Sequence, residues 1–416
     1  MSDSRAGVED LDRCITHEQL TADLFGLRRL VPPGGVAVIR SPTAILVGAA
    51  LQALEGWAAD VCLAGDLPVS DLPEDAIELG GATTRTPGEA ATPLSTMVAH
   101  PSHAVTTRWW LYSSGTTGEP KAVAHTRSSL SRTVRTGRAG APARRWGMLY
   151  EPTRMAGAQV LIQALTAGDH LLDAMGLPHL GERVAWLAEH GVDSLSATPT
   201  TWRQILQTPA SRTLRVRQIT LGGEIADQRI LDALHRSFPE ARITHVFAST
   251  ETGAAFGVSD GREGFPARYL DDPPGGVLLE VRDGILHVAA QTSATEADGF
   301  VSTGDVVEVL DDRVLFRGRA SGLVNIGGVK VWPEQVEKIL RCHPDVADAL
   351  VTSRRNAFSG WILTALVVPV LGADRATLPV SARELCAASL PAAAVPATVK
   401  VVDELPLSST GKAVRQ

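Results

Sequence analysis

The sequence lacks any long run of basic or of acidic residues. Its 416 residues include 39 lysines and arginines and 46 acidic residues, and the formal net charge of −7 is spread along the chain. Nucleic acids and anionic membranes attract concentrated positive charge, so we expect neither as a partner. No segment reaches the roughly 20 consecutive apolar residues of a membrane span, and no apolar stretch follows a basic start as in a secretory signal. We therefore expect a cytoplasmic location.

Cysteine is also scarce. The four cysteines, Cys14, Cys62, Cys342 and Cys386, are far apart and form no Cys-x-x-Cys pair. Neither a zinc knuckle nor a disulfide framework is indicated, because both need cysteines at short, regular spacings. We expect reduced and mostly buried thiols.

Lysine is rare because arginine supplies most of the positive charge. The chain has five lysines: Lys121, Lys330, Lys338, Lys400 and Lys412. Lys121 and Lys412 stand in segments rich in glycine or turn residues, where a compact, mobile ammonium group differs most from a guanidinium. We expect a function for these two, and a plain surface position for Lys338 and Lys400.

What the sequence does contain is a regular alternation of strand and helix patterns. Its length suggests two or three domains of roughly 150 residues each. Strands alternate with helices from Val36 to Phe247, which predicts an α/β domain with largely parallel sheets, and short strands from Gly275 onward predict an antiparallel subdomain. The predicted strands are 36–39, 59–63, 108–112, 194–197, 217–221, 243–247, 276–281, 285–288, 306–309, 314–318, 347–352 and 362–369, and the predicted helices are 44–57, 155–167, 183–190, 230–238 and 333–342.

The segment from Tyr112 to Lys121, YSSGTTGEPK, combines the features that phosphate groups need. Glycines let backbone N–H groups approach closely, hydroxyl groups donate hydrogen bonds, and the lysine supplies a cation. The spacing differs from GxxxxGK[ST], so a P-loop NTPase is not favoured. The segment predicts a phosphate-binding loop, with a flexible surface loop as the alternative.

Four further segments follow this loop in order: FASTE at 247–251, TGD at 303–305, GRASG at 318–322 and PLSSTGKAVR at 406–415. Together the five segments resemble the motifs of the acyl-adenylate-forming superfamily, which includes acyl-CoA synthetases, peptide-synthetase adenylation domains and beetle luciferases. The resemblance extends from about Val36 to Arg415. It implies an α/β fold: a large N-terminal domain of helix-flanked sheets with an antiparallel subdomain, 1–318, a hinge, 319–322, and a small mobile α+β C-terminal domain, 323–416.

The resemblance also implies roles for single residues. Glu251 would hold Mg²⁺, because a hard cation prefers carboxylate oxygen, and Thr250 would hydrogen-bond a phosphate. Phe247 would stack on adenine, and Asp305, beside Arg319, would accept hydrogen bonds from the ribose hydroxyls. The implied ATP-binding residues are Ser113, Ser114, Gly115, Thr116, Thr117, Gly118, Lys121, Gly222, Gly223, Glu224, Phe247, Ala248, Ser249, Thr250, Asp305 and Arg319.

Lys412 would act in the first half-reaction, together with Thr250 and Glu251. Attack of a carboxylate on the α-phosphate of ATP brings two anions together, and a cation that contacts both stabilises the transition state. In the resembled family the small domain then rotates, and Gly327 and Gly328 would line a tunnel for the incoming thiol.

Two of the positions at which this sequence departs from the family bear on the predicted hinge and acyl pocket. Gly322 stands where the hinge usually carries Asp or Lys, and we expect it to be the pivot, because glycine permits large φ/ψ changes. Arg154 stands where a His or aromatic residue gates the acyl pocket. It is predicted either to pair with a polar or anionic group of the substrate or to be an ordinary surface arginine. The predicted acyl pocket comprises Arg154, Gly157, Gln159, Thr198, Leu221 and Val246.

The resemblance implies an enzyme that uses ATP and Mg²⁺ to activate a small carboxylic acid as its acyl-adenylate, with release of pyrophosphate. A thiol would then displace AMP. Coenzyme A is the first choice, because no carrier domain follows Gln416, and a free carrier protein, an amine or another nucleophile are alternatives. The competing class is a non-catalytic nucleotide- or acyl-binding protein, against which the presence of both Glu251 and Lys412 argues. Neither the acid nor the oligomeric state can be deduced from the sequence.

Overall fold

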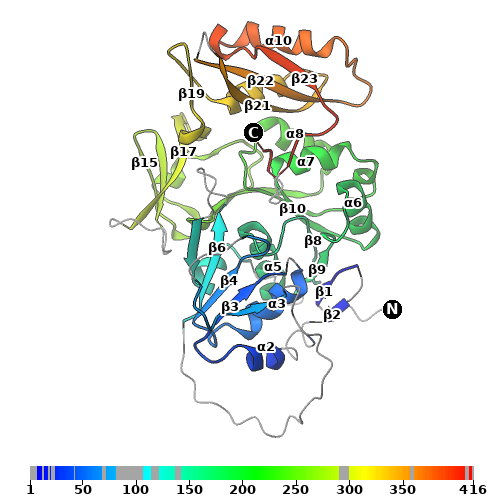
Figure 1. Cartoon of the computed structure of the whole chain (residues 1–416). Helices are drawn as coiled ribbons and strands as arrows, with labels where there is room; N and C mark the ends of the chain where they lie inside the picture. Colours follow the sequence, from blue (N-terminus) through cyan, green and yellow to red (C-terminus); the bar gives the residue numbers. More distant parts are fainter. Residues whose placement is uncertain are drawn as a thin grey trace.

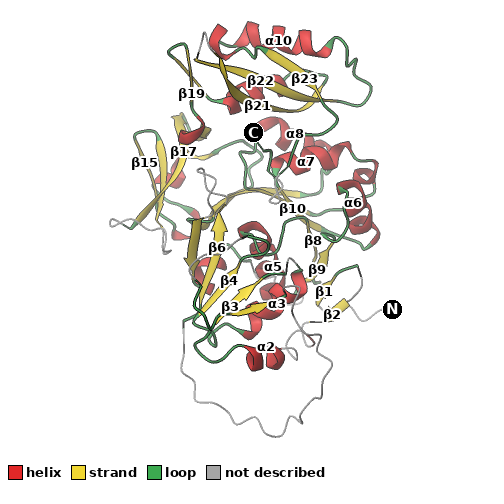
Figure 2. Ribbon diagram, in the orientation of Figure 1, coloured by secondary structure: helices red, strands yellow, loops and turns green. Residues whose placement is uncertain are grey.

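The computed structural model confirms the predicted α/β class, with several sheets and flanking helices (Figure 1, Figure 2). It describes residues 7–11, 14–16, 19, 24–41, 43–67, 72–80, 106–113, 121–135, 142–289, 299–356, 360–407 and 412–414.

The largest sheet has eight strands in the order β13-β12-β11-β10-β8-β9-β1-β2. Neighbouring strands from β12 to β1 run parallel, whereas β13 and β2 pair antiparallel at the two edges. The strands are β13 (Gly253–Val258), β12 (Arg242–Ser249), β11 (Gln218–Gly222), β10 (Ser194–Ala197), β8 (Arg145–Met148), β9 (His170–Asp173), β1 (Gly7–Glu9) and β2 (Cys14–Thr16).

A second sheet has five strands in the order β5-β3-β4-β6-β7. Its first four strands are parallel, and β7 turns back antiparallel to β6. The strands are β5 (Ile77–Leu79), β3 (Val36–Ile39), β4 (Asp60–Leu63), β6 (Arg108–Ser113) and β7 (Lys121–His125).

The helices of these two sheets follow the predicted pattern with local differences. They are α2 (Leu24–Leu30), α3 (Ala44–Ala53), α4 (Arg127–Leu130), α5 (Met155–Ala167), α6 (Leu180–Glu189), α7 (Pro199–Gln207) and α8 (Gln228–Ser237). Helix α5 has the predicted bounds, but α3 stops at Ala53 and not at Trp57. The reason is local: Gly56 has a positive φ of 70°, which belongs to a turn.

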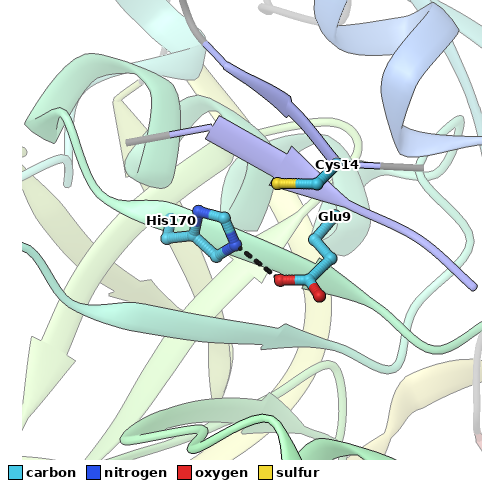
Figure 3. A group of neighbouring side chains, drawn as sticks. All are labelled: Glu9, Cys14 and His170. Carbon is cyan, nitrogen blue, oxygen red and sulfur yellow. Dashed lines mark hydrogen bonds and ion pairs between the residues drawn. The ribbon is translucent and has the colours of Figure 1, made fainter. Parts of the chain in front are cut away.

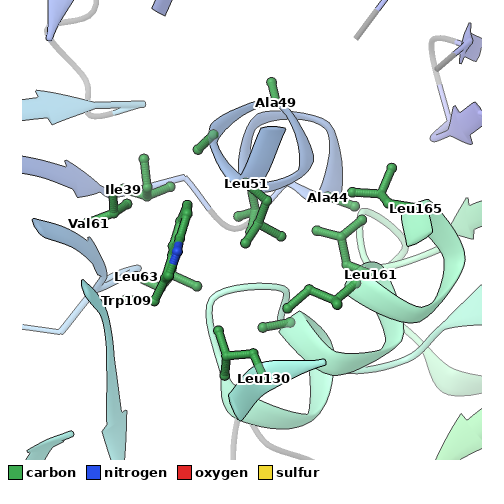
Figure 4. Packing of buried hydrophobic residues seen from close by; sticks show 14 of the residues in the cluster. Ile39, Ala44, Ala49, Leu51, Val61, Leu63, Trp109, Leu130, Leu161 and Leu165 are labelled. Atoms are coloured by element: carbon green, nitrogen blue, oxygen red, sulfur yellow. The ribbon is translucent and has the colours of Figure 1, made fainter. Parts of the chain in front are cut away.

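The main hydrophobic core lies where α3 and α5 pack between the two sheets (Figure 4). Leu51 of α3 points toward Trp109 and Leu63 of the five-stranded sheet, while Leu161 of α5 lies against the same helix. Trp109, Leu63 and Leu161 are fully buried. Because burying each such side chain contributes roughly 1.5–3 kcal/mol, this core holds the two sheets at a fixed orientation.

A separate five-stranded sheet is antiparallel throughout, as predicted, in the order β14-β18-β17-β16-β15. Its strands are β14 (Phe265–Pro266), β18 (Arg313–Arg319), β17 (Phe300–Leu310), β16 (Ile285–Ala289) and β15 (Leu279–Arg282). The strand expected from Gly276 starts at Leu279, because Pro274–Gly276 forms a 3₁₀ turn in which Gly275 has a φ of 76°.

The C-terminal residues form their own α+β unit, at the top of Figure 1. It contains the hairpin β19 (Val324–Ile326) and β20 (Val329–Val331), the sheet β21 (Val346–Asn356), β22 (Gly360–Pro369) and β23 (Thr398–Val401), and the helices α9 (Pro333–Arg341) and α10 (Leu378–Ser389). The remaining 3₁₀ helices are Pro209–Arg212, Ala267–Leu270, Ala320–Gly322 and Ala392–Ala394. This unit has a separate hydrophobic cluster around Val336, Leu340 and Val367. The hinge at 319–322 stays a prediction.

The expectation of mostly buried cysteines is wrong for half of them. Cys62 and Cys386 are buried, whereas Cys14 and Cys342 are exposed. Among the helices that the structure describes, none has the length and apolarity needed to cross a bilayer.

Candidate active site

A cleft of about 1830 Å³ opens between the largest sheet, the antiparallel sheet and the C-terminal unit. This is larger than the roughly 300–1,000 Å³ of a typical small-molecule site, so it has room for a nucleotide together with a second ligand. The predicted ATP-site and catalytic residues that line it are Lys121, Gly222, Gly223, Glu224, Phe247, Ala248, Ser249, Thr250, Glu251, Asp305, Arg319 and Lys412.

The predicted phosphate loop starts and ends on paired strands. Ser113, at the end of β6, is the cross-strand neighbour of Lys121, at the start of β7. Ser114, Gly115, Thr116, Thr117 and Gly118 lie outside the described residues. The antiparallel pairing places Lys121 beside the strand from which the loop leaves.

Lys412 reaches the cleft because its neighbour is anchored to Glu224. The backbone N–H of Ala413 donates to Glu224 Oε1 at 3.0 Å, and the backbone N–H of Thr200 donates to Glu224 Oε2 at 3.0 Å. A short antiparallel bridge pairs Leu407 with Ala413, the residue after the lysine. Glu224 therefore joins the C-terminal segment to the start of α7.

The side chain of Lys412 lies directly against Gly223. A Cβ atom added to Gly223 would lie 3.1 Å from Lys412 Cε, and Gly223 has a positive φ of 83°. Both observations require glycine at this position, since other residues rarely adopt that φ and would press on the lysine.

The charge environment of Lys412 is mixed. Burial, with Arg319 as a lesser cause, lowers the pKa of Lys412 from its ordinary value, while Glu224, Glu251 and Asp305 act in the opposite direction. The ammonium group thus lies within electrostatic range of the predicted metal ligand and of the predicted ribose ligand.

Asp305 and Arg319 are cross-strand partners on β17 and β18. Arg319 Nη1 donates to Asp305 Oδ1 at 3.0 Å, and the backbone N–H of Asp305 donates to Thr303 Oγ1 at 3.0 Å. Burial raises the pKa of Asp305, while Arg319 and Thr303 act to lower it. The pair presents an oriented carboxylate to the cleft, which suits recognition of neighbouring hydroxyl groups.

The segment with Thr250 and Glu251 follows β12 in a tight turn. Ser249 Oγ accepts the backbone N–H of Thr252 at 3.1 Å, which closes the turn. His125, at the end of β7, donates from Nε2 to the carbonyl oxygen of Thr250 at 2.7 Å. Burial lowers the pKa of His125, so the ring is neutral at pH 7. Sequence reasoning missed this residue, although it shares a strand face with Lys121 four positions earlier.

Phe247 lines the cleft and lies among other aromatic rings. Its ring is nearly parallel to Phe256 and to Phe316, with centroid distances of 5.4 Å and 5.5 Å. These neighbours hold the ring in one orientation. Its stacking on adenine stays a prediction.

The predicted acyl-pocket residues divide into two groups. Arg154, Gln159, Thr198 and Val246 line the cleft, whereas Gly157 and Leu221 are not among its lining residues. A Cβ atom on Gly157 would meet the backbone carbonyl oxygen of Glu151, so glycine is needed there for close packing of α5. Leu221 belongs to the core of the largest sheet.

Two lining residues of the cleft are already engaged within the protein. Arg154 Nε lies 3.3 Å from Glu151 Oε2. Thr198 Oγ1 accepts the backbone N–H of Thr201 at 3.0 Å and so caps α7.

Two other lining residues present donors that the described part of the chain does not pair. Arg132 Nη1 and Gln159 Nε2 are buried atoms without a hydrogen-bond partner. Leaving such a donor unpaired costs roughly 1–3 kcal/mol, more if it is charged, so an ordered water or a ligand oxygen would satisfy each. Arg132 was not predicted from the sequence.

The predicted thiol-tunnel and hinge glycines lie in the C-terminal region. Gly327 and Gly328 form the exposed turn of the β19–β20 hairpin, with positive φ angles of 57° and 90°, and they do not line the cleft. Gly322 ends the 3₁₀ turn after β18, where an added Cβ would lie 3.7 Å from Glu334 Oε1. Lys412 and not the glycine hairpin occupies the cleft in this conformation.

Comparison with known proteins agrees with this geometry. The family model of AMP-binding enzymes matches residues 47–281, and the model of the AMP-binding enzyme C-terminal domain matches residues 335–412. A 2-succinylbenzoate–CoA ligase of Listeria innocua is 25% identical over 329 residues, which cover 73% of this chain and 68% of that protein. A probable non-canonical nonribosomal peptide synthetase of Salinispora arenicola is 29% identical over 340 residues, covering 73% of this chain but 4% of that much longer protein.

A crystal structure of the anthranilate CoA ligase AuaEII in complex with anthranoyl-AMP has the same fold. It superposes with a TM-score of 0.75 at 18% identity, covering 99% of this chain and 92% of that one.

Proposed function

This chain belongs to the AMP-binding enzyme family, and so to the acyl-adenylate-forming superfamily, and we propose that it is an AMP-forming acid–thiol ligase. It would activate a small carboxylic acid with ATP and Mg²⁺, release pyrophosphate, and pass the acyl group to a thiol. The cytoplasmic location stays a prediction.

The observation that carries this proposal is the position of Lys412. It lies against Gly223 and within electrostatic range of Glu251 and Asp305, in the same cleft. An ammonium group there would contact both the carboxylate of the acid and the α-phosphate oxygens. It offsets their repulsion as the new bond forms, which is the main contribution an active site makes to such a reaction.

The surrounding residues fit the nucleotide and its metal. Asp305 would accept the ribose hydroxyls while Arg319 holds it in place at 3.0 Å. Glu251 would hold Mg²⁺, since its carboxylate is the ligand type that this hard cation prefers. His125 would position the Thr250–Glu251 segment through the Thr250 carbonyl. Bound Mg²⁺ would supply charge neutralisation for the phosphates.

The acid would carry a second polar group besides the reacting carboxylate. Arg132 and Gln159 offer buried donors that no described residue pairs, and Arg154, the residue before α5, lines the same cleft. A carbonyl, carboxylate or hydroxyl oxygen on the substrate would pair these donors, whereas a purely aliphatic acid would leave them unsatisfied. This proposal extends the expectation for Arg154 to two further residues.

The second half-reaction requires the C-terminal unit to move. Rotation about Gly322 would withdraw Lys412 and bring Gly327 and Gly328 to the cleft. It would break the contacts that hold the present arrangement: Lys338 Nζ to Glu263 Oε1 at 2.7 Å and Arg341 Nη1 to Asp227 Oδ2 at 3.4 Å. Lys338 is exposed, as expected from the sequence, and its partner in this position is Glu263.

Coenzyme A is the proposed acceptor, because the chain aligns with a CoA ligase over most of that protein's length. A free carrier protein is the alternative, since the chain also aligns with part of a nonribosomal peptide synthetase. If neither thiol reacts, an amine or another nucleophile is the remaining candidate for the acceptor.

Acid-dependent exchange of pyrophosphate into ATP tests the first step. We expect exchange with acids that carry a second oxygen group, and a loss of about 10²–10³-fold in Lys412→Ala, comparable to removing one transition-state donor. Lys400→Ala, an exposed lysine on β23, is the control. ATP binding without exchange for any acid would favour the non-catalytic binding protein. Product masses with coenzyme A then identify the acceptor.

A further inference from the structure

A second polar cluster lies at the other edge of the largest sheet, where β1, β2 and β9 meet (Figure 3). It consists of Glu9, Cys14 and His170, and none of the three lines the cleft. No part of the proposed reaction uses these residues.

The three side chains converge from three different strands. Glu9 on β1 is the cross-strand partner of Cys14 on β2, and β1 runs parallel to β9, which carries His170. A carboxylate oxygen, the Sγ atom and an imidazole nitrogen all lie within 4.8 Å of one another. His170 Nε2 donates to Glu9 Oε2 at 3.0 Å, and Figure 3 shows Cys14 on the adjoining strand beside this pair.

A fourth side chain, His190, lies beside Glu9, next to the three residues whose ligand atoms lie within 4.8 Å of one another. His190, which follows α6, donates from Nδ1 to the carbonyl oxygen of Trp186 at 2.7 Å, so its Nε2 carries the lone pair. That Nε2 lies 3.8 Å from Glu9 Oε1. The ring also stacks on Trp186 at a centroid distance of 4.0 Å. A backbone carbonyl that sets the tautomer of a histidine is a common feature around metal ligands.

The nearby positive charge does not exclude a cation. Arg145 Nη2 lies 3.4 Å from Glu9 Oε2, and its Nε donates to the His190 carbonyl oxygen at 2.7 Å. An ionised Glu9 and a Cys14 thiolate carry two negative charges, which exceed the single charge of Arg145. Arg145 would hold the Glu9 carboxylate in its orientation without binding the ion itself.

We propose that Glu9, Cys14, His170 and His190 bind one Zn²⁺ ion. Zinc takes four ligands in tetrahedral geometry and accepts thiolate, imidazole and carboxylate together, whereas Mg²⁺ and Ca²⁺ favour oxygen ligands alone. Binding releases the Cys14 thiol proton and shifts the His170 ring proton from Nε2 to Nδ1, so that two metal–ligand bonds replace the His170–Glu9 hydrogen bond. The ion fastens the β1–β2 hairpin to β9 and α6, so the site is structural.

Cobalt substitution of the full chain tests this site. The reduced protein is treated with a chelator, exchanged into buffer with excess Mg²⁺, and titrated with Co²⁺. We expect a near-ultraviolet thiolate-to-cobalt absorption that saturates at one ion per chain and disappears when Zn²⁺ is added. Zn²⁺ should also raise the Tm, since it binds the folded state. Absence of the thiolate absorption in the wild-type chain would overturn the proposal.

Matched variants separate this site from adventitious binding. Cys14→Ser should abolish the thiolate absorption, whereas Cys342→Ser, which removes the other exposed cysteine, should keep it. His190→Gln should weaken Co²⁺ affinity by about 10–100-fold. This variant tests the site if Cys14→Ser does not fold. Unchanged absorption in Cys14→Ser, or unchanged affinity in His190→Gln, would refute the assignment. Pyrophosphate exchange should continue in His190→Gln, so a failure here leaves the proposed ligase activity untouched.

Discussion

The carboxylate of Glu224 accepts the backbone N–H of Ala413 at 3.0 Å, although 189 residues separate the two in the chain. Ala413 follows Lys412 directly, so this bond sets the depth at which the lysine enters the cleft. The other oxygen of Glu224 is held by the start of α7. Glu224 is thus a positioning residue for Lys412, a role beyond its predicted place among the ATP-binding residues.

Replacing Glu224 with glutamine should slow adenylation about tenfold. The amide can accept only one of the two N–H groups, and a hydrogen bond to a charged group contributes roughly 1.5–3 kcal/mol. The kcat of pyrophosphate exchange should fall more than the KM for ATP changes. Glu240→Gln, an exposed glutamate after α8, should leave both constants unchanged. Equal rates in the two variants would contradict the positioning role.

Gly223→Ala should disturb Lys412 in a way that a glycine substitution elsewhere does not. The new Cβ would lie 3.1 Å from Lys412 Cε at a φ of 83°. Gly168→Ala is the control, since Gly168 has a similar φ of 71° and nothing within 4 Å of an added Cβ. Both variants should lose about 1 kcal/mol of stability from backbone strain, and only Gly223→Ala should also lose adenylation rate. Thermal unfolding and pyrophosphate exchange measure the two effects.

The pH dependence of adenylation should report the lowered pKa of Lys412. The reaction needs the protonated ammonium group, so activity is present below the pKa of Lys412 and is lost as pH rises through it. Because burial lowers that pKa, kcat/KM should decline on the alkaline side at a pH below the ordinary lysine value of 10.5. Lys412→Arg should be slower but should lack this decline, since arginine stays protonated. If Lys412→Arg showed the same decline at alkaline pH, the decline would belong to the titration of another group.

Gln159→Leu should shift the preference among acids. It removes a buried donor that pairs with none of the described residues, so acids without a second oxygen group should gain relative to those with one, by roughly 10-fold or more. Gln163→Leu, one turn further along α5, is the matched control. Its amide is already paired with the backbone of Arg135, with N–O distances of 3.0 Å and 2.9 Å. Unchanged ratios of kcat/KM across an acid panel in Gln159→Leu would remove Gln159 from the acid site.

Much of the fold could be predicted because it depends on local pattern. Helix α5 and strand β10 have the predicted bounds, since a 3.6-residue or two-residue hydrophobic period is a property of neighbouring residues. The ordered motifs likewise predicted that Glu251, Asp305, Arg319 and Lys412 belong to one site, and all four line the same cleft.

The sequence by itself therefore determined the fold class and the chemistry of the cleft, through glycine, hydroxyl and charged residues at fixed short spacings. Only the tertiary structure decided which polar groups meet across the chain. Glu224 reaches Ala413, His125 reaches Thr250, and Glu9 reaches His170 over separations of 189, 125 and 161 residues. Such contacts depend on strand order and register. Strand order and register follow from the packing of the whole core, so no single segment of the sequence encodes them.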